Sequence, residues 1–288
     1  MTEKIVLLGC GQTAQALIAR LRAEQFGGSI YATTRDAERQ VALAALGAEP
    51  ILLADSEALL KGDRSNFQKL FAKARILVSF PPGGNSDEVL SAIAGSAGAE
   101  SIVYISSTGV YGGATGVVDE STAVAASPSA LPRLAAEECW RRQGAVIVRA
   151  PGLYSPASGL HLRLLSGNYR LPANGSNYVS RIHLDDLARL ILACFERARA
   201  GSTYVAGDLL PARHIDVVTW LCERLSLPLP ASVPLEQVSP TLRGNRQVNA
   251  AKILNDMGVS LTYPTYVEGY SHCLSFLNTA SAGRQPSV

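Results

Sequence analysis

Short apolar runs alternate with longer amphipathic segments along the first half of the chain. The runs have the length of buried strands and are bounded by turn residues, and the segments between them have helical periodicity. The apolar runs cover residues 5–8, 29–34, 50–53, 75–80, 101–106 and 145–149. Because strands that alternate with helices form parallel sheets, the pattern predicts an α/β fold, a doubly wound parallel sheet of the Rossmann type with helices on both faces.

The rest of the chain predicts a smaller lobe that is mostly helical. A helix at 185–199 and a strand at 203–206 are expected to return to the sheet, whereas helices near 213–226, 249–257 and 265–278 form the lobe. We therefore expect a dinucleotide-binding domain at 1–150 completed by 181–206, a substrate lobe from 151–180 and 207–278, and a disordered tail at 279–288.

A glycine-rich turn follows the first apolar run. Its sequence is Gly9-Cys10-Gly11-Gln12-Thr13-Ala14, and an amphipathic run comes after it. Gly9 permits a sharp turn, Gly11 leaves room for a pyrophosphate beside the backbone, and Ala14 keeps the helix close to the strand. The unpaired N–H groups of the helix start favour an anion. The motif predicts a dinucleotide site that includes Gln12 and Thr13; the alternative is a plain strand–turn–helix packing corner.

The end of the second run bears on which dinucleotide binds. A site that prefers NAD carries an acid about 20 residues after the glycines, whereas this run ends in Thr33, Thr34 and Arg35. Arg35 can hold a 2′-phosphate with two hydrogen bonds, and Thr33 or Thr34 can donate to it. Asp36 is better placed as the N-cap of a helix at 36–46. The sequence therefore favours NADP over NAD, unless Arg35 is only a solvated surface charge.

Further strand ends are expected beside the cofactor. The fourth run stops at Phe80-Pro81-Pro82, and in a doubly wound sheet such a loop lies at the carboxyl end of a strand, where ligands bind. As a loop it needs no functional reason. We place Ser106 and Pro151, which end later strands, at the same edge.

Composition narrows the function classes. The 288 residues are 47% hydrophobic and 17% charged, which supplies a core and argues against disorder. The net charge of +2 gives no sign of a nucleic-acid surface. No apolar run approaches the roughly 18 residues of a membrane span, and residues 1–4 lead straight into a strand rather than a signal peptide. We expect a cytoplasmic protein with a small-molecule substrate and with no nucleic-acid or membrane partner; a homodimer stays open.

Neither a metal site nor a disulfide is predicted. The five cysteines are odd in number and show no Cys-x-x-Cys spacing, and the four histidines are dispersed. Cys10 lies in the glycine turn and is interpreted as filler rather than a nucleophile. In the segment around His183 and Asp185, a packed histidine and a capping carboxylate are favoured over catalysis.

Several motifs together resemble the extended short-chain dehydrogenase/reductase superfamily, which includes nucleotide-sugar epimerases and dehydratases. Besides the glycine turn, they lie at 104–112 (YISSTGVYG), 149–154 (RAPGLY), 181–188 (RIHLDDLA), 248–254 (VNAAKIL) and 261–264 (LTYP). The Gly-x-Gly-x-x-Ala form looks like the atypical members. By this resemblance the active-site hydroxyl is Ser107, with Thr108 beside it; the alternative is a polar strand end that caps itself.

The catalytic Tyr-x-x-x-Lys pair of that superfamily is missing. The matching helix places Ser129 and Arg133 at the two positions, and the chain has no lysine between residues 74 and 251. An arginine there stays protonated and a serine is a poor proton donor, although Arg133 can still hold ribose hydroxyls. Another phenol would have to serve as acid, and the candidates are Tyr111, Tyr154 and Tyr178.

Two functions remain open from the sequence. The first is an NAD(P)-dependent epimerase/dehydratase-like oxidoreductase that transfers hydride to or from a small organic or sugar-nucleotide substrate held partly by the polar segment 155–180. In this interpretation Ser107 and Thr108 are catalytic, with Arg133 and Tyr154 as further candidates. The segment Arg243-Gly-Asn-Arg246 could bind a phosphate of the substrate or could simply be a solvated turn. The second is a non-catalytic NADP-binding redox sensor or regulatory protein, which the missing pair favours. Fold similarity alone does not decide between them.

Overall fold

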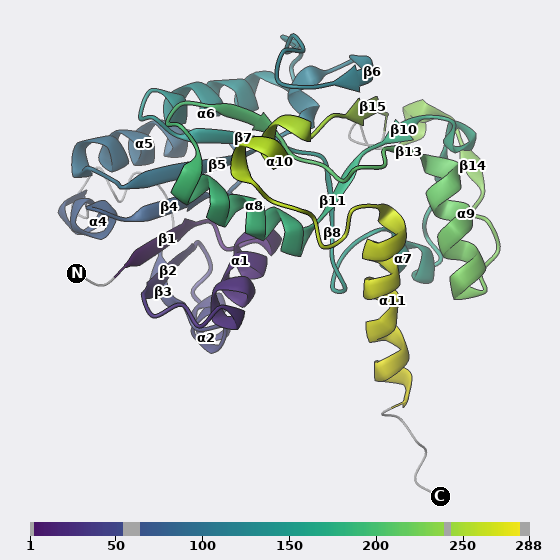
Figure 1. The fold of residues 1–288 in the computed structure, drawn as a ribbon, viewed down its shortest axis with the longest axis horizontal. Coiled ribbons are helices and arrows are strands. Elements are labelled where there is room, and N and C mark those ends of the chain that lie inside the picture. Colours follow the sequence, from purple (N-terminus) through teal and green to yellow (C-terminus); the bar gives the residue numbers. More distant parts are fainter. Residues whose placement is uncertain (1–2, 54–63, 239–242, 283–288) are drawn as a thin grey trace, which may run out of the picture.

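A parallel sheet of seven strands forms the centre of the computed structural model, which describes residues 3–53, 64–238 and 243–282 (Figure 1). Its strands are β1 (Lys4–Leu8), β2 (Ser29–Thr34), β3 (Glu49–Leu52), β4 (Arg75–Val78), β5 (Ser101–Ser107), β7 (Val146–Ala150) and β12 (Thr203–Val205). They lie in the order β12-β7-β5-β4-β1-β2-β3, and all neighbours are parallel. The doubly wound α/β prediction is confirmed.

Both faces of the sheet are covered, which explains why its strands are continuous apolar runs. On β1, Ile5 and Leu7 join one core and Val6 and Leu8 the other. The first core contains residues of α1 (Gln12–Ala23), α2 (Arg39–Ala45), α8 (Leu184–Arg197) and α10 (Ala251–Met257). The second contains residues of α4 (Arg64–Phe71), α5 (Ser86–Ala97) and α6 (Leu131–Arg141). Among the described residues, no helix has both the length and the apolar character of a membrane span.

A third core belongs to the small lobe, which lies at the end of the molecule away from the N-terminal strand (Figure 1). Its helices are α7 (Leu160–Leu165), α9 (His214–Leu225) and α11 (Tyr266–Ala282). Its short strands are β8 (Gly152–Tyr154), β9 (Leu171–Pro172), β10 (Tyr178–Val179), β11 (Arg181–His183), β13 (Ala212–Arg213) and β14 (Ser232–Val233), with 3₁₀ turns η3 (Ala173–Gly175) and η4 (Leu235–Gln237).

Two expectations about the C-terminal part need correction. The helix expected at 249–257 does not belong to the small lobe, because Ile253 and Met257 of α10 pack in the core of the large sheet. The tail expected to be disordered from residue 279 is helical as far as Ala282, where α11 ends, and residues 283–288 lie outside the described part. Residues 54–63 also lie outside it.

One strand pair joins segments far apart in the sequence. After β5 and the 3₁₀ turn η2 (Thr108–Tyr111), β6 (Thr115–Val118) pairs in parallel with β15 (Asn245–Val248). The pairing brings Arg246 to the loop after β5, where its Nη1 donates a hydrogen bond to the carbonyl of Gly112 at 2.5 Å. The sequence pattern does not predict this contact, although it fixes one wall of the site described next.

Candidate functional site

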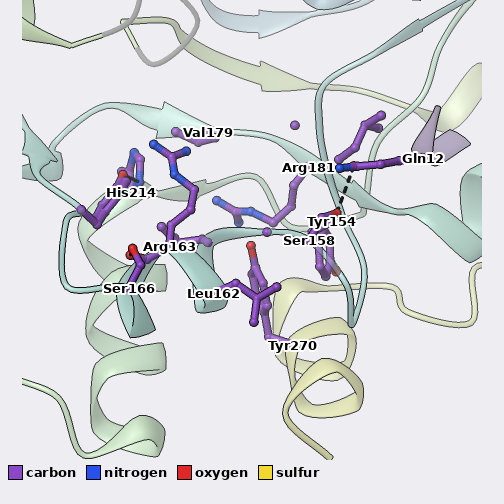
Figure 2. A pocket seen from close by; sticks show the side chains of 15 residues that line it. Gln12, Tyr154, Ser158, Leu162, Arg163, Ser166, Val179, Arg181, His214 and Tyr270 are labelled. Atoms are coloured by element: carbon purple, nitrogen blue, oxygen red, sulfur yellow. Dashed lines mark hydrogen bonds between the residues drawn. The ribbon is translucent and has the colours of Figure 1, made fainter. Parts of the chain in front are cut away.

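Three cavities lie along the carboxyl ends of the strands and the adjoining lobe. The glycine-loop cavity has a volume of about 610 Å³ and is lined by Gly9, Gly11, Thr34, Arg35, Arg39, Phe80, Pro81 and Pro82 among others. The serine cavity, of about 340 Å³, is lined by Ser107, Thr108, Pro151, Arg163, Tyr178 and Arg246 among others. The lobe cavity, of about 560 Å³, is lined by Gln12, Tyr154, Arg163, Tyr169, Arg181 and His214 among others (Figure 2).

The two glycines of the turn have different tasks. Gly9 has a φ of +84°, and a Cβ built on it would lie 2.8 Å from Cβ of Phe80, so only glycine fits between β1 and the loop after β4. Gly11 has an extended backbone, and a Cβ there would meet nothing within 4 Å. The space beside Gly11 is therefore open toward the cavity, as a bound pyrophosphate requires.

The start of α1 has free hydrogen-bond donors. Gly11 is its N-cap and supplies no side-chain acceptor, so the first N–H groups of this 12-residue helix face the glycine-loop cavity without a capping side chain. Thr13 and Ala14 are buried on the inner side of the helix. The side-chain amide oxygen (Oε1) of Gln12 accepts a hydrogen bond from the hydroxyl of Ser158 at 3.0 Å, which links the glycine turn to the lobe (Figure 2).

Two guanidinium groups line the outer part of the glycine-loop cavity. Arg35 is exposed there, and Arg39 donates from Nη2 to the carbonyl of Cys10 at 3.0 Å. The hydroxyl of Thr34 bonds to the backbone of Asp36. Asp36 is not the N-cap of the following helix, as the sequence suggested, because α2 begins later, with Glu38 at its N-cap. Arg39 was not among the cofactor-binding residues predicted from the sequence, because its segment was predicted only to form a helix.

The serine cavity brings together hydroxyl groups and cations. Ser107 ends β5 and accepts a hydrogen bond from the N–H of Gly109, so it also caps its own turn, as the alternative interpretation held. Thr108 is buried beside it. The side chain of Tyr178 comes from β10 in the lobe. Burial lowers the pKa of Arg246, but an arginine remains charged at neutral pH. The cavity therefore offers donors to a carbonyl or an anion.

Ser106 points away from all three cavities. Its hydroxyl donates to Oε1 of Glu137 at 2.5 Å, and Arg149 donates to both oxygens of the same carboxylate at 3.0 and 2.8 Å. Ser106, Glu137 and Arg149 are all buried. Burial raises the pKa of Glu137, but the hydrogen bonds from Arg149 and Ser106 outweigh it and hold the pKa below its usual value. The side chain of Ser106 therefore contacts Glu137 inside the core, and the place of Ser106 beside the cofactor stays a prediction.

Arg133 and Ser129, the two residues that the sequence motif predicts in place of the Tyr-x-x-x-Lys pair, lie outside the three cavities described above. Arg133 donates to the hydroxyl of Tyr104 at 3.2 Å and to the carbonyl of Ile105 at 3.3 Å, so its charge supports β5. Ser129 is exposed and pairs with the hydroxyl of Ser127. Neither Arg133 nor Ser129 lines any of the three cavities.

The structure separates the three candidate phenols. The hydroxyl of Tyr111 donates to the carbonyl of Asp119 and accepts from Arg149, so it is used inside the core. Tyr154 is buried, stacks on Tyr270 with ring centres 4.4 Å apart, and lines the lobe cavity. Tyr178 alone of the three lines the same cavity as Ser107.

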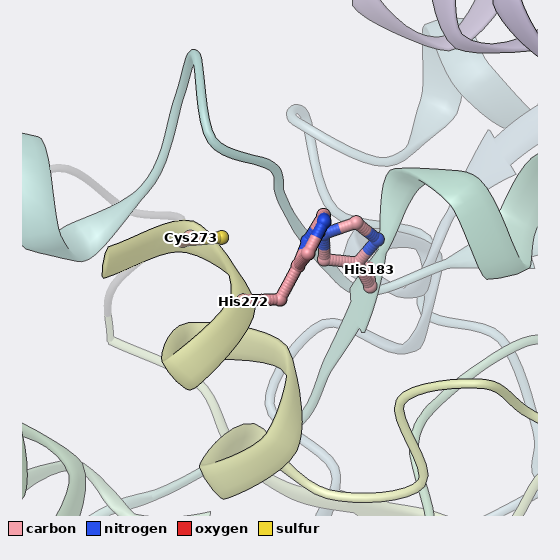
Figure 3. A group of neighbouring side chains, drawn as sticks. All are labelled: His183, His272 and Cys273. Carbon is pink, nitrogen blue, oxygen red and sulfur yellow. The ribbon is translucent and has the colours of Figure 1, made fainter. Parts of the chain in front are cut away.

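Two histidines that are distant in sequence meet between α8 and α11, next to a cysteine (Figure 3). Potential ligand atoms of His183, His272 and Cys273 lie within 4.8 Å of one another. His183 Nδ1 accepts from the N–H of Asp185, which caps α8, so its proton is on Nε2, 3.4 Å from Nδ1 of His272. A metal ion would have to bind the lone pair of Nε2 of His183, but in this tautomer Nε2 carries the proton and has no free lone pair. The arrangement therefore favours a hydrogen-bonded histidine pair, and His183 packs as the sequence suggested.

Comparison with known proteins places this geometry in a fold family. No protein-family model and no curated protein matches the chain. A conserved protein of unknown function from Silicibacter pomeroyi has 29% sequence identity and a TM-score of 0.80, with 96% of this chain and 99% of that chain covered. An NAD-dependent epimerase/dehydratase-like protein from Methylobacillus flagellatus has 23% identity and a TM-score of 0.75, over 96% and 100% of the chains.

A further similar structure contains its cofactor. It is a double mutant of DesIV, a dTDP-glucose 4,6-dehydratase from Streptomyces venezuelae with bound NAD; the identity is 17%, the TM-score 0.77 and the coverage 97% and 98%. At such identity the likeness concerns the fold. The comparisons therefore show that the chain shares the Rossmann-type α/β fold of these structures.

Proposed function

We propose that this protein is an NAD(P)-dependent oxidoreductase of the epimerase/dehydratase-like type. The observation that carries the proposal is the pair of cavities at the carboxyl edge of one parallel sheet. The glycine-loop cavity adjoins β1, β2 and β4 and has an uncapped helix start and an open side at Gly11; the serine cavity adjoins β5 and β7 and has paired hydroxyls. A dinucleotide along this edge would place phosphates at the first cavity and nicotinamide at the second.

NADP is the proposed cofactor because the outer part of the glycine-loop cavity is basic. Arg35 and Arg39 line it, and the one carboxylate there, Asp36, accepts a hydrogen bond from the N–H of Glu38. NAD in the structure of DesIV supports a nicotinamide dinucleotide in general. The choice between the two rests on this side-chain chemistry alone.

Titration calorimetry with both dinucleotides tests this choice. We expect NADP to bind about tenfold or more tightly than NAD, because a hydrogen bond to a charged group contributes roughly 1.5–3 kcal/mol. Arg35→Ala should remove most of that difference, whereas Arg199→Ala, an exposed arginine that lines none of the three cavities, should not. Equal affinities for NADP and NAD in the unmodified protein would refute the preference.

The reaction would occur in the serine cavity. A bound nicotinamide dinucleotide supplies or accepts the hydride. Ser107 and Thr108 would hold the oxygen of the substrate carbon that changes oxidation state, and Tyr178 would donate or accept the proton on that oxygen. Tyr178 takes this role instead of Tyr154 because it shares a cavity with Ser107.

Hydride transfer from NADPH to a panel of carbonyl compounds and sugar nucleotides tests the enzyme proposal. With a substrate that reacts, Ser107→Ala and Tyr178→Phe should each lower kcat about 100-fold or more, as removal of an oxyanion donor or a general acid does. The control Tyr204→Phe alters a tyrosine that bonds to Asp256 and should leave kcat unchanged. Activity retained in both site variants would exclude this assignment.

A second candidate function is a non-catalytic NADP-binding sensor. The observation that favours it is the inward direction of Arg133, together with exposed Ser129, because these residues replace the catalytic pair of the superfamily. Tight NADPH binding without hydride transfer to any member of the panel would support the sensor over the enzyme.

A further inference from the structure

The lobe cavity contains buried donors that the hydride reaction does not use. The Nη1 atom of Arg181 and the hydroxyl of Tyr154 are buried and have no hydrogen-bond partner, and their residues are 4% and 1% exposed. Both residues line the cavity. A buried donor without a partner costs free energy, so a native protein normally satisfies it with water or with a ligand.

The charge of this cavity is positive. Arg181 and Arg163 line it, and none of its lining residues is an aspartate or glutamate. Figure 2 shows both arginines reaching into the space between His214 on one side and Tyr154 on the other. Arg163 lies over the ring of Tyr169 at 4.8 Å, and the hydroxyl of Tyr169 is fixed by His214 at 2.6 Å. These contacts hold one guanidinium group at the cavity and restrict its freedom.

A buried carboxyl group behind Arg181 does not cancel this charge. Asp208 is buried, and within the described part of the chain no ion pair joins its carboxyl group to Arg181. Burial raises the pKa of Asp208 to about 7, against the opposing effects of Arg181 and of the backbone N–H of Leu210. A large fraction of the Asp208 side chains is therefore protonated near neutral pH.

We infer that the lobe cavity binds an anionic group of the substrate, a phosphate or a carboxylate, through Arg181 and Arg163. Planar guanidinium groups match the oxygens of either anion. Arg163, Gly152 and Val179 line both this cavity and the serine cavity, so the two spaces are neighbours. The substrate would then be a compact acid whose reacting carbon lies in the serine cavity. That the bound anion belongs to the substrate rests on the proposed function.

Calorimetric titration with inorganic phosphate and with malonate, at constant ionic strength and without cofactor, tests the site. We expect the unmodified protein to bind at least one of them, and the tighter one tells whether the group is a phosphate or a carboxylate. Arg181→Gln and Arg163→Gln should each weaken binding about tenfold or more. Arg170→Gln is the matched control, because Arg170 follows Tyr169 directly but lines none of the cavities.

Several outcomes would overturn the inference. These are an absence of binding of both anions, unchanged affinity in Arg163→Gln, or a loss of affinity in Arg35→Gln alone, which would place the anion in the glycine-loop cavity. Arg163 is exposed, so its variant should fold even where Arg181→Gln does not. Because the titration needs neither cofactor nor turnover, anion binding without hydride transfer would refute the proposed function and leave the site standing.

Discussion

Glu137→Ala is expected to lower the free energy of unfolding by about 3–5 kcal/mol. The carboxylate is 1% exposed and accepts hydrogen bonds from Arg149 and Ser106, and Arg149 is itself buried. Removal of one member of a buried ion pair leaves the other as an uncompensated buried charge, which is the costly case. Urea denaturation of the purified variant measures the difference.

Glu138→Ala is the matched control on the same helix. Glu138 pairs with Arg141 and Arg142 at the surface, where such ion pairs contribute about 0–1 kcal/mol. Because the pKa of Glu137 is held below its usual value, its contribution to stability should also be lost on acidification below the carboxyl range of the unfolded chain. Equal effects of the two substitutions would show that the buried network does not stabilise the carboxyl end of β5.

Gly11→Val is expected to abolish dinucleotide binding while it leaves stability nearly unchanged. The backbone at Gly11 is extended, which valine adopts readily, and a Cβ would contact no protein atom within 4 Å. We therefore expect a loss of stability of only about 1 kcal/mol or less, the cost of a poorer N-cap residue, because no tertiary contact is disturbed. The added side chain would fill the space in which the pyrophosphate approaches the backbone, so affinity should fall at least about 100-fold.

Gly9→Val, in contrast, should mainly lower the stability of the folded protein. At a φ of +84°, with Phe80 atoms within 3 Å of the new Cβ, the substitution strains the protein itself, by about 1–3 kcal/mol or more. The pair of variants separates a glycine needed for folding from one needed for the ligand. A Gly11→Val protein that binds NADPH normally would show that the pyrophosphate lies elsewhere.

Much of the fold could be predicted from local patterns. The run 29–34 matches β2 at both ends, and the helix predicted at 185–199 overlaps α8 (Leu184–Arg197), because a buried parallel strand and an amphipathic helix each have a distinct sequence pattern. The small lobe was harder. Its strands of two or three residues are too short to show a period, and the pairing of β6 with β15 joins segments more than a hundred residues apart.

The candidate site could be predicted only where a local motif marks it. The glycine turn was predicted from its spacing and Ser107 from the family that its motif resembles, and both line cavities at the expected edge. Arg181 begins the motif at 181–188, but no binding role was predicted for it, and His272 lies in no motif. Their surroundings depend on which helices the lobe packs together, and a lone arginine or histidine in an amphipathic segment has the same local pattern whether it is solvated or buried.

A structure of the protein with NADPH would test the central claim most directly. The account predicts the pyrophosphate at Gly11 and the start of α1, the 2′-phosphate at Arg35, and the nicotinamide in the serine cavity beside Ser107 and Tyr178. A dinucleotide bound in the lobe cavity, or a nicotinamide turned away from Ser107, would contradict it.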